Sequence, residues 1–160
     1  AANEHCQFLN VWTPAINDDR KRPVMVWLHG GGFTDGSSIE PLYDGRNISE
    51  KGDLVFVSLN HRLSVGGFLD LSAFGDKYQH SANAGIADIV AALMWVQVNI
   101  EKFGGDPDNV TILGQSGGGA KVLTLMATPA AEGLFHKAIV QSGAALGFGM
   151  TLGNKDVSRK

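Results

Sequence analysis

The sequence predicts an α/β fold with a mostly parallel sheet, and three observations support this prediction. Short apolar runs without polar alternation recur along the chain, as is typical of strands buried on both faces. An amphipathic helical repeat lies between two of these runs, and glycine clusters directly follow two of them. Strands that alternate with helices are usually joined by right-handed crossovers. We therefore expect a single α/β domain, or part of one, over residues 1–160.

The predicted strands are the apolar runs themselves. The runs are rich in β-branched and aromatic residues, and several end at glycine, proline or polar turns. Strands are expected near residues 7–12, 24–28, 54–59, 110–114 and 137–141.

Two helices are predicted between these strands. The first covers residues 86–100, with Ser81 or Asn83 as its expected N-cap and Gly104 soon after its end. The second covers residues 117–127 and ends before a proline. The first helix carries one apolar stripe at three- and four-residue steps: Ile86, Ile89, Val90, Leu93, Val96 and Ile100.

Composition excludes several classes of function. The 160 residues carry a net charge of −3, so we expect no nucleic-acid partner. The apolar runs end well before about 18 residues, so we expect no membrane span. The single cysteine, Cys6, excludes an internal disulfide framework, and no residue cluster has metal-ligand spacing. We therefore expect no metal and no cofactor.

Glycine is the outlier, with 21 of the 160 residues, against roughly 7% in an average protein. One cluster is residues 30–32, which follow a predicted strand and lie between His29 and Phe33. Consecutive glycines let backbone N–H groups point at one spot without obstruction by side chains. An oxyanion hole needs such donors, although an ordinary glycine-rich turn has the same sequence.

The second cluster surrounds Ser116 in the pattern G-x-S-x-G, again between a predicted strand and a predicted helix. This pattern is the nucleophile elbow, in which a tight turn lifts the serine hydroxyl above the sheet. A phosphate-binding P-loop would need lysine directly after Gly119, but Ala120 stands there and Lys121 comes one place later. Residues 147–153 likewise miss the dinucleotide-binding glycine spacing by one position.

Taken together and in this order, these segments resemble the type-B carboxylesterases, the carboxylesterase/cholinesterase branch of the α/β-hydrolases. The resemblance implies a partial α/β-hydrolase core with helices on both faces of the sheet. It also implies that residues 1–160 are an N-terminal-half portion of one such domain, an internal fragment of a longer protein. The segments that carry the resemblance are residues 4–14, 29–33, 60–69, 83–100, 103–111 and 133–143.

The resemblance also implies a role for each site residue. Ser116 would be the acyl-accepting nucleophile of a carboxylic ester hydrolase. Gly31, Gly32 and Gly117 would supply the oxyanion N–H groups, and Gly30 would shape the turn. The implied partner is a small-molecule ester, and no cofactor is implied.

The sequence departs from the family pattern at several positions. Gln115 stands where glutamate is common and Gly117 where alanine is common. His5, His61 and Ser64 stand where aspartate, tyrosine and glycine are frequent. Gln115 removes a negative charge beside the site, which disfavours cationic, choline-like substrates but removes no member of the catalytic triad.

The triad order in this fold is serine, then an acid, then histidine. After Ser116 the sequence offers only Glu132 and Asp156 as acids and only His136 as a base. The resemblance makes His136 structural, so we expect the triad acid and histidine to lie beyond residue 160. We therefore expect these 160 residues to be inactive as an isolated chain.

Two alternatives belong to other classes or families. A non-catalytic, cholinesterase-like adhesion domain would usually have lost the nucleophile or its turn, and both are present here. A hormone-sensitive-lipase-like esterase shares the glycine run and an elbow, but residues 9–12 and 103–111 favour the type-B family.

Several further residues have more than one interpretation. His29 either contacts the site or holds the glycine turn through backbone hydrogen bonds. Ser142 either bonds near the back of the site or simply ends a strand. Cys6 is expected to be a free thiol, although the resemblance places a disulfide cysteine there in secreted relatives. Asn47 and Asn109 lie in glycosylation sequons, of which the second is expected to be structural.

Overall fold

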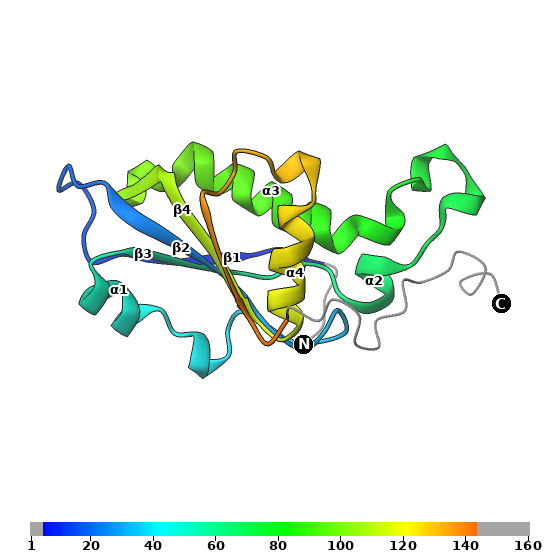
Figure 1. The fold of residues 1–160 in the computed structure, drawn as a ribbon, viewed down its shortest axis with the longest axis horizontal. Coiled ribbons are helices and arrows are strands. Elements are labelled where there is room, and N and C mark those ends of the chain that lie inside the picture. Colours follow the sequence, from blue (N-terminus) through cyan, green and yellow to red (C-terminus); the bar gives the residue numbers. More distant parts are fainter. Residues whose placement is uncertain (1–4, 144–160) are drawn as a thin grey trace.

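The computed structural model describes residues 5–143 and shows a five-stranded sheet with helices on both sides (Figure 1). The strand order is β1-β3-β2-β4-β5; β1 pairs antiparallel with β3, and all other pairs are parallel. The predicted α/β fold is therefore confirmed. The strands are β1 (Leu9–Trp12), β2 (Arg22–Leu28), β3 (Val55–Leu59), β4 (Gly105–Gln115) and β5 (Lys137–Gln141).

The helices cover the sheet unequally. In Figure 1, α3 and α4 lie on one side of the sheet and α1 lies on the other. The two predicted helices are confirmed as α3 and α4, whereas two short helices, α1 and α2, were not predicted. The helices are α1 (Arg46–Gly52), α2 (Ser64–Phe68), α3 (Ala84–Asn99) and α4 (Gly117–Met126).

Of the two N-cap candidates of α3, Asn83 is confirmed in position only. Asn83 is the N-cap residue, but its side chain makes no capping hydrogen bond. The Ser81 hydroxyl is engaged elsewhere, because it accepts a hydrogen bond from the N–H of Leu71 at 2.8 Å. The predicted stop is confirmed: a short 3₁₀ turn follows α3, and Gly104 ends it in the left-handed conformation, with φ of 75°. A 3₁₀ turn, Ser81–Asn83, also precedes α3, and the N–H of Ala84 at the start of α3 donates to the Ser81 carbonyl of this turn.

Strand β4 begins earlier than the apolar run predicted. It starts at Gly105, which pairs with Arg22 of β2 before a shift of register between Arg22 and Val24. A side chain at Gly105 would press against Ile100 and Val24, so glycine allows this close approach.

The core lies between the sheet and the two helices α3 and α4. The predicted stripe of α3 is buried there, with Ile89, Leu93 and Val96 fully covered. The helical stretch Asp76–Phe103 is long and apolar enough to cross a membrane by length and composition. Ile89, Leu93 and Val96 of this stretch lie in the core, whereas Met94 and Val98 are exposed.

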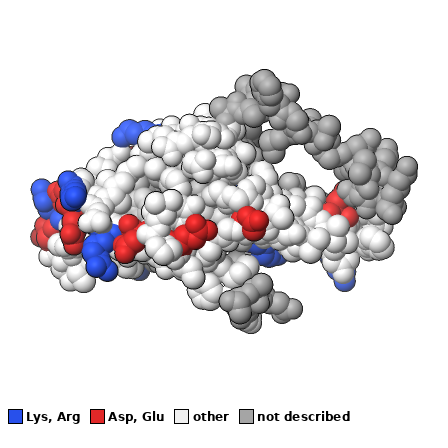
Figure 2. All heavy atoms as spheres, turned by 90° about the horizontal axis from the view of Figure 1, so that it is seen from below, with Lys and Arg blue, Asp and Glu red and all other residues white. Residues whose placement is uncertain are grey.

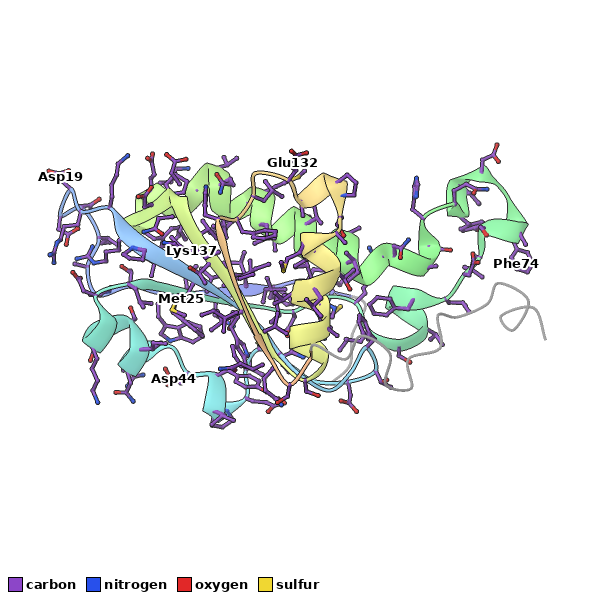
Figure 3. All side chains as sticks on the ribbon, viewed as in Figure 1. Asp19, Met25, Asp44, Phe74, Glu132 and Lys137 are labelled. Carbon is purple, nitrogen blue, oxygen red and sulfur yellow. The ribbon has the colours of Figure 1, made fainter. Side chains whose placement is uncertain are left out.

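Charged side chains gather at the end of the sheet where β2 begins (Figure 2). Arg22 is 96% covered and bonds to the carboxylates of Asp18 and Asp53, and Arg20 also contacts Asp53 at 2.9 Å. These contacts lower the pKa of Asp18 to about 2, chiefly through its hydrogen bond from Arg22. Figure 3 places Asp19 at the tip of this end of the molecule.

Candidate active site

The two glycine clusters meet at one edge of the sheet. β2 and β4 are neighbouring parallel strands, and Leu28 pairs with Gly114 at their carboxyl ends. Residues 29–33 and 115–119 therefore leave the sheet side by side, although more than 80 residues separate them along the chain. Clefts beyond the carboxyl ends of parallel strands are the usual place for sites in such folds.

The turn at Ser116 has the geometry of a nucleophile elbow. Ser116 has φ of 55° and ψ of −121°, a conformation that non-glycine residues rarely adopt. Its N–H donates to the carbonyl of Gln141 on β5 at 2.8 Å. A side chain on Gly114 would collide with the backbone of Gly118, and one on Gly118 with the carbonyl of Leu28. The glycines are therefore required by close backbone contacts.

The glycine run lies directly against this turn. A Cβ atom placed on Gly117 would lie 2.5 Å from the backbone nitrogen of Gly32, and one on Gly30 would lie 3.7 Å from Ser116 Cβ. The N–H groups of Gly31, Gly32 and Gly117 have no hydrogen-bond partner within residues 5–143. Three unpaired main-chain donors thus stand beside one strained serine.

These donors are oriented by the carbonyls of the same peptide groups. In a planar trans peptide the C=O and the N–H point in opposite directions, so holding one end fixes the other. His29 Nδ1–H donates to the Gly30 carbonyl at 2.8 Å, which fixes the N–H of Gly31. The N–H of Asp35 donates to the Gly31 carbonyl at 3.2 Å, which fixes the N–H of Gly32.

The third donor is fixed by the helix that follows the serine. The N–H of Ala120 donates to the Ser116 carbonyl at 3.1 Å, so the N–H of Gly117 points away from α4. It lies at the amino end of that helix, where the helix dipole favours negative charge. An oxygen that gains negative charge here would meet oriented donors and a favourable field.

The supporting residues are placed as follows. Gln115 is exposed, and its Oε1 atom lies close to Gly30. His29 holds the glycine turn, in agreement with one of its two interpretations. Ser142 is exposed in the turn after β5, with φ of 51°, and its hydroxyl has no hydrogen-bond partner among the described residues. Its contribution to the site stays a prediction.

The acid and base candidates after Ser116 lie elsewhere. His136 precedes β5 at the strand's amino end, and its Nδ1 accepts a hydrogen bond from the N–H of Val110 at 3.1 Å. It therefore ties the start of β5 to the middle of β4 and is structural, as expected. Glu132 is exposed on the loop before β5 (Figure 3), and Asp156 lies outside the described residues.

Sequence reasoning missed a buried basic cluster beneath the glycine run. Lys121 is fully buried, and its ammonium donates to the His29 carbonyl at 3.2 Å. His29 and His61 are also buried, and their rings stack with centroids 5.1 Å apart. Burial lowers the pKa of His61 to about 4 and that of Lys121 to about 8. Only the absence of a P-loop drew attention to Lys121 in the sequence.

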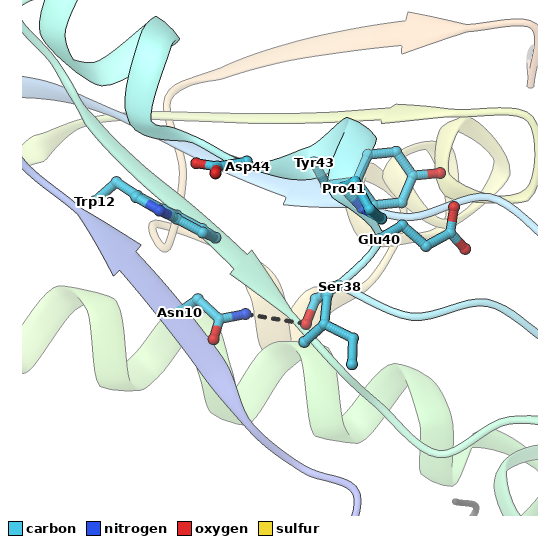
Figure 4. A pocket seen from close by; sticks show the side chains of 8 residues that line it. Asn10, Trp12, Ser38, Glu40, Pro41, Tyr43 and Asp44 are labelled. Atoms are coloured by element: carbon cyan, nitrogen blue, oxygen red, sulfur yellow. Dashed lines mark hydrogen bonds between the residues drawn. The ribbon is translucent and has the colours of Figure 1, made fainter.

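A separate pocket lies between β1 and the 3₁₀ turn Pro41–Tyr43 (Figure 4). Trp12, Tyr43 and Glu40 line it, and Asn10 Nδ2 donates to Ser38 Oγ at 3.2 Å across its floor. None of the elbow or glycine-run residues lines this pocket. It is therefore distinct from the candidate site.

Comparison with known proteins agrees with this geometry. The model of the carboxylesterase family matches residues 1–158, and the chain belongs to that family. It is 50% identical over 143 residues to para-nitrobenzyl esterase of Bacillus subtilis, covering 89% of this chain and 29% of that protein. It is 44% identical over 156 residues to human cocaine esterase, covering 97% of this chain and 27% of that protein.

A solved structure shows the same relationship. An esterase from Clostridium hathewayi, described as able to hydrolyse aliphatic aromatic polyesters, superposes with a TM-score of 0.85 at 59% identity. The match covers 86% of this chain and 28% of that one. The chain thus spans less than a third of the length of these relatives.

Proposed function

We propose that the whole protein carrying this chain is a carboxylic ester hydrolase, with Ser116 as its nucleophile. The observation that supports this most is the group of three unpaired N–H donors, on Gly31, Gly32 and Gly117, beside a serine in strained backbone geometry. An adhesion domain has no use for such donors, whereas acyl transfer requires them.

The reaction would proceed through an acyl-serine. The Ser116 oxygen attacks the ester carbonyl carbon, and its proton passes to a general base. The carbonyl oxygen becomes negatively charged and accepts hydrogen bonds from the three N–H groups. The bond to the leaving alcohol then breaks, and water later hydrolyses the acyl-serine by the same route. Within residues 5–143 no imidazole bonds to the Ser116 hydroxyl, so the base would come from another part of the whole protein.

The substrate class follows from the charge at the turn. Gln115 places a neutral amide directly before Ser116, next to Gly30. A carboxylate in that place would attract a cation, and an amide does not. We therefore infer that neutral small-molecule esters are preferred over cationic ones.

Replacement of the nucleophile tests this function. In the whole protein, Ser116→Ala should lower hydrolysis of a neutral p-nitrophenyl ester by about a thousandfold or more, because no acyl-enzyme can form. A fluorophosphonate probe should label Ser116 in the wild-type protein, and mass spectrometry of the labelled peptide should locate the adduct.

Ser72→Ala is the matched control, because Ser72 is a serine in the loop before α3. It should leave both rate and labelling unchanged. Retention of more than a tenth of the wild-type rate by a folded Ser116→Ala protein would exclude Ser116 as the nucleophile.

A further inference from the structure

Lys121 is a buried cation that the proposed reaction does not yet use. It lies on α4, five residues after Ser116, with no surface exposed. Lysine is almost never fully buried unless it is paired. Yet no carboxylate among the described residues lies within salt-bridge distance of its Nζ atom. The burial of this charge therefore calls for an explanation.

The contacts of Lys121 bracket the glycine run. Its Nζ atom donates to the carbonyl of His29, which immediately precedes the run, at 3.2 Å. The same atom lies 5.5 Å from the ring centre of Phe33, which immediately follows the run. Because Lys121 belongs to the helix that begins at Gly117, these contacts tie the nucleophile's helix to both ends of the donor segment.

No other cation lies beside the Lys121 ammonium among the ionisable groups that surround it in the described part of the chain. His29, after β2, and His61, after β3, each donate a hydrogen bond from Nδ1 to the next carbonyl, which leaves Nε2 as an acceptor. Both Nε2 atoms are buried and have no partner within the described chain. Burial lowers the pKa of both rings, so they are neutral at pH 7. From the loop after Phe33, Asp35 favours the charged form of Lys121 electrostatically.

We propose that Lys121 is a positioning residue for ester hydrolysis, whose ammonium holds the His29 carbonyl and thereby keeps residues 30–32 against Ser116. This inference rests on the proposed function. Fixing the His29 carbonyl fixes the first peptide group of the run, as His29 and Asp35 fix the next two. A charged donor makes a stronger hydrogen bond than a neutral one, so the run is held best while Lys121 is protonated.

Loss of that proton should therefore be visible in the reaction. Burial lowers the pKa of Lys121 to about 8. Above this pH the neutral amine holds the carbonyl less firmly, and the rate of acylation should fall. His29 and His61 are already uncharged in this range, so their titration does not produce the fall.

The test compares Lys121→Met, Lys121→Arg and Lys77→Met in the whole protein, with kcat and KM measured for a p-nitrophenyl ester from pH 7 to 10. Lys121→Met should lower kcat by about tenfold at pH 7.5 and change KM by less than about twofold. It should also abolish the alkaline decline. Lys121→Arg should likewise show no alkaline decline in kcat up to pH 10, because arginine stays charged.

The control lysine, Lys77, lies over the ring of Tyr78 at 4.7 Å on the loop before α3. Lys77→Met should match the wild-type protein in every measurement. The melting temperature of Lys121→Met should be equal to or above that of wild type, because a buried cation without a paired carboxylate is unfavourable. A purely structural lysine would instead lower it.

Several results would overturn the inference: a kcat of Lys121→Met within twofold of wild type, an unchanged alkaline decline in that variant, or a loss of kcat that parallels a loss of stability. If Lys121→Met does not fold, the rate of fluorophosphonate labelling of wild-type Ser116 decides, and a rate that stays flat from pH 7 to 10 contradicts the proposal. A wild-type protein that neither hydrolyses esters nor labels at Ser116 would instead refute the proposed function.

Discussion

The two ends of the parallel strands use charge in opposite ways. At the end where β2 begins, Arg22 meets the carboxylates of Asp18 and Asp53, so each charge has an oppositely charged partner. At the other end, Lys121 is buried without a paired carboxylate beside two neutral histidines. At the end where β2 begins, the charged groups pair with one another. At the end that carries Ser116, the N–H groups of Gly31, Gly32 and Gly117 have no partner within the described residues.

This difference shows where the molecule keeps its unsatisfied polar groups. Buried or crowded polar groups normally find partners, because an unpaired one is costly. Around Ser116, the carbonyl ends of the donor peptides are bonded while their N–H ends are not. An end built for stability would pair both. The pairing of one side only is what a site that stabilises a transient oxyanion requires.

The largest expected effect is on kcat, when a methyl group is added to the glycine run beside Ser116. A Cβ atom on Gly31 would collide with the carboxylate and the carbonyl of Asp35, and φ of 87° disfavours any side chain there. In the whole protein, Gly31→Ala should displace the donor segment and lower kcat by about a hundredfold. KM should change little, because the ground-state carbonyl is held weakly. Steady-state kinetics with a p-nitrophenyl ester measures both.

Gly133→Ala is the control for this substitution. Gly133 has a similar φ of 74°, but nothing lies within 4 Å of its ideal Cβ position. It should therefore share the backbone strain and leave kcat unchanged. Gly32→Ala, with φ of 62° and only Thr34 Oγ1 near its ideal Cβ position, at 3.9 Å, tests the second donor with little steric conflict. If both Gly31→Ala and Gly32→Ala keep kcat within twofold, the run is only a turn.

A smaller effect should appear when the buried histidines are challenged with acid. Burial lowers the pKa of His61 from 6.5 to about 4, so the folded ring stays neutral where the unfolded ring takes up a proton. The contribution of the neutral His61 ring to the free energy of unfolding is fully present above pH 6.5. It is lost as the pH falls to 4, by up to about 3 kcal/mol. His61→Gln should remove this part of the acid sensitivity, as measured by denaturant unfolding at pH 7 and pH 4.5.

The exposed imidazole of His80 provides the comparison. His80→Gln should retain the wild-type dependence on pH over the same range. If His61→Gln and wild type showed the same pH dependence of unfolding, the buried His61 ring would not determine the acid stability of the protein.

The smallest effect is expected at the paired, charged end. Because the pKa of Asp18 is lowered to about 2, its ion pair with Arg22 stabilises the fold above about pH 4, and this contribution disappears as the pH falls toward 2. Asp18→Asn should lower the melting temperature at pH 7 by a few degrees at most. It should also flatten the fall in melting temperature between pH 4.5 and pH 3, with ester hydrolysis unchanged.

Asp19→Asn is the neighbouring control, since Asp19 forms no salt bridge within the described residues and asparagine tolerates its φ of 55°. A change in ester hydrolysis caused by Asp18→Asn would contradict the separation of the two ends.

The sequence was informative where local chemistry decides the structure. The apolar runs predicted the strands, and the glycines around Ser116 predicted the turn, because only glycine allows those backbone contacts. The N-cap of α3 was predicted correctly at Asn83, but neither candidate side chain caps the helix, and the Ser81 hydroxyl bonds to Leu71, ten positions away. The buried cluster of His29, His61 and Lys121 escaped prediction for the same reason. Three separate segments must fold together before these side chains meet.

The backbone of Ser116 has a consequence for how such a protein evolves. A residue with φ of 55° and ψ of −121° carries strain of about 1–3 kcal/mol, which glycine would relieve. At position 116, thermal stability therefore favours glycine, whereas the proposed ester hydrolysis requires serine. Laboratory selection for thermal resistance without selection for hydrolysis would therefore favour glycine in place of Ser116, the proposed nucleophile. In relatives no longer selected for ester hydrolysis, we expect Ser116 to be replaced by glycine, because that substitution also raises stability.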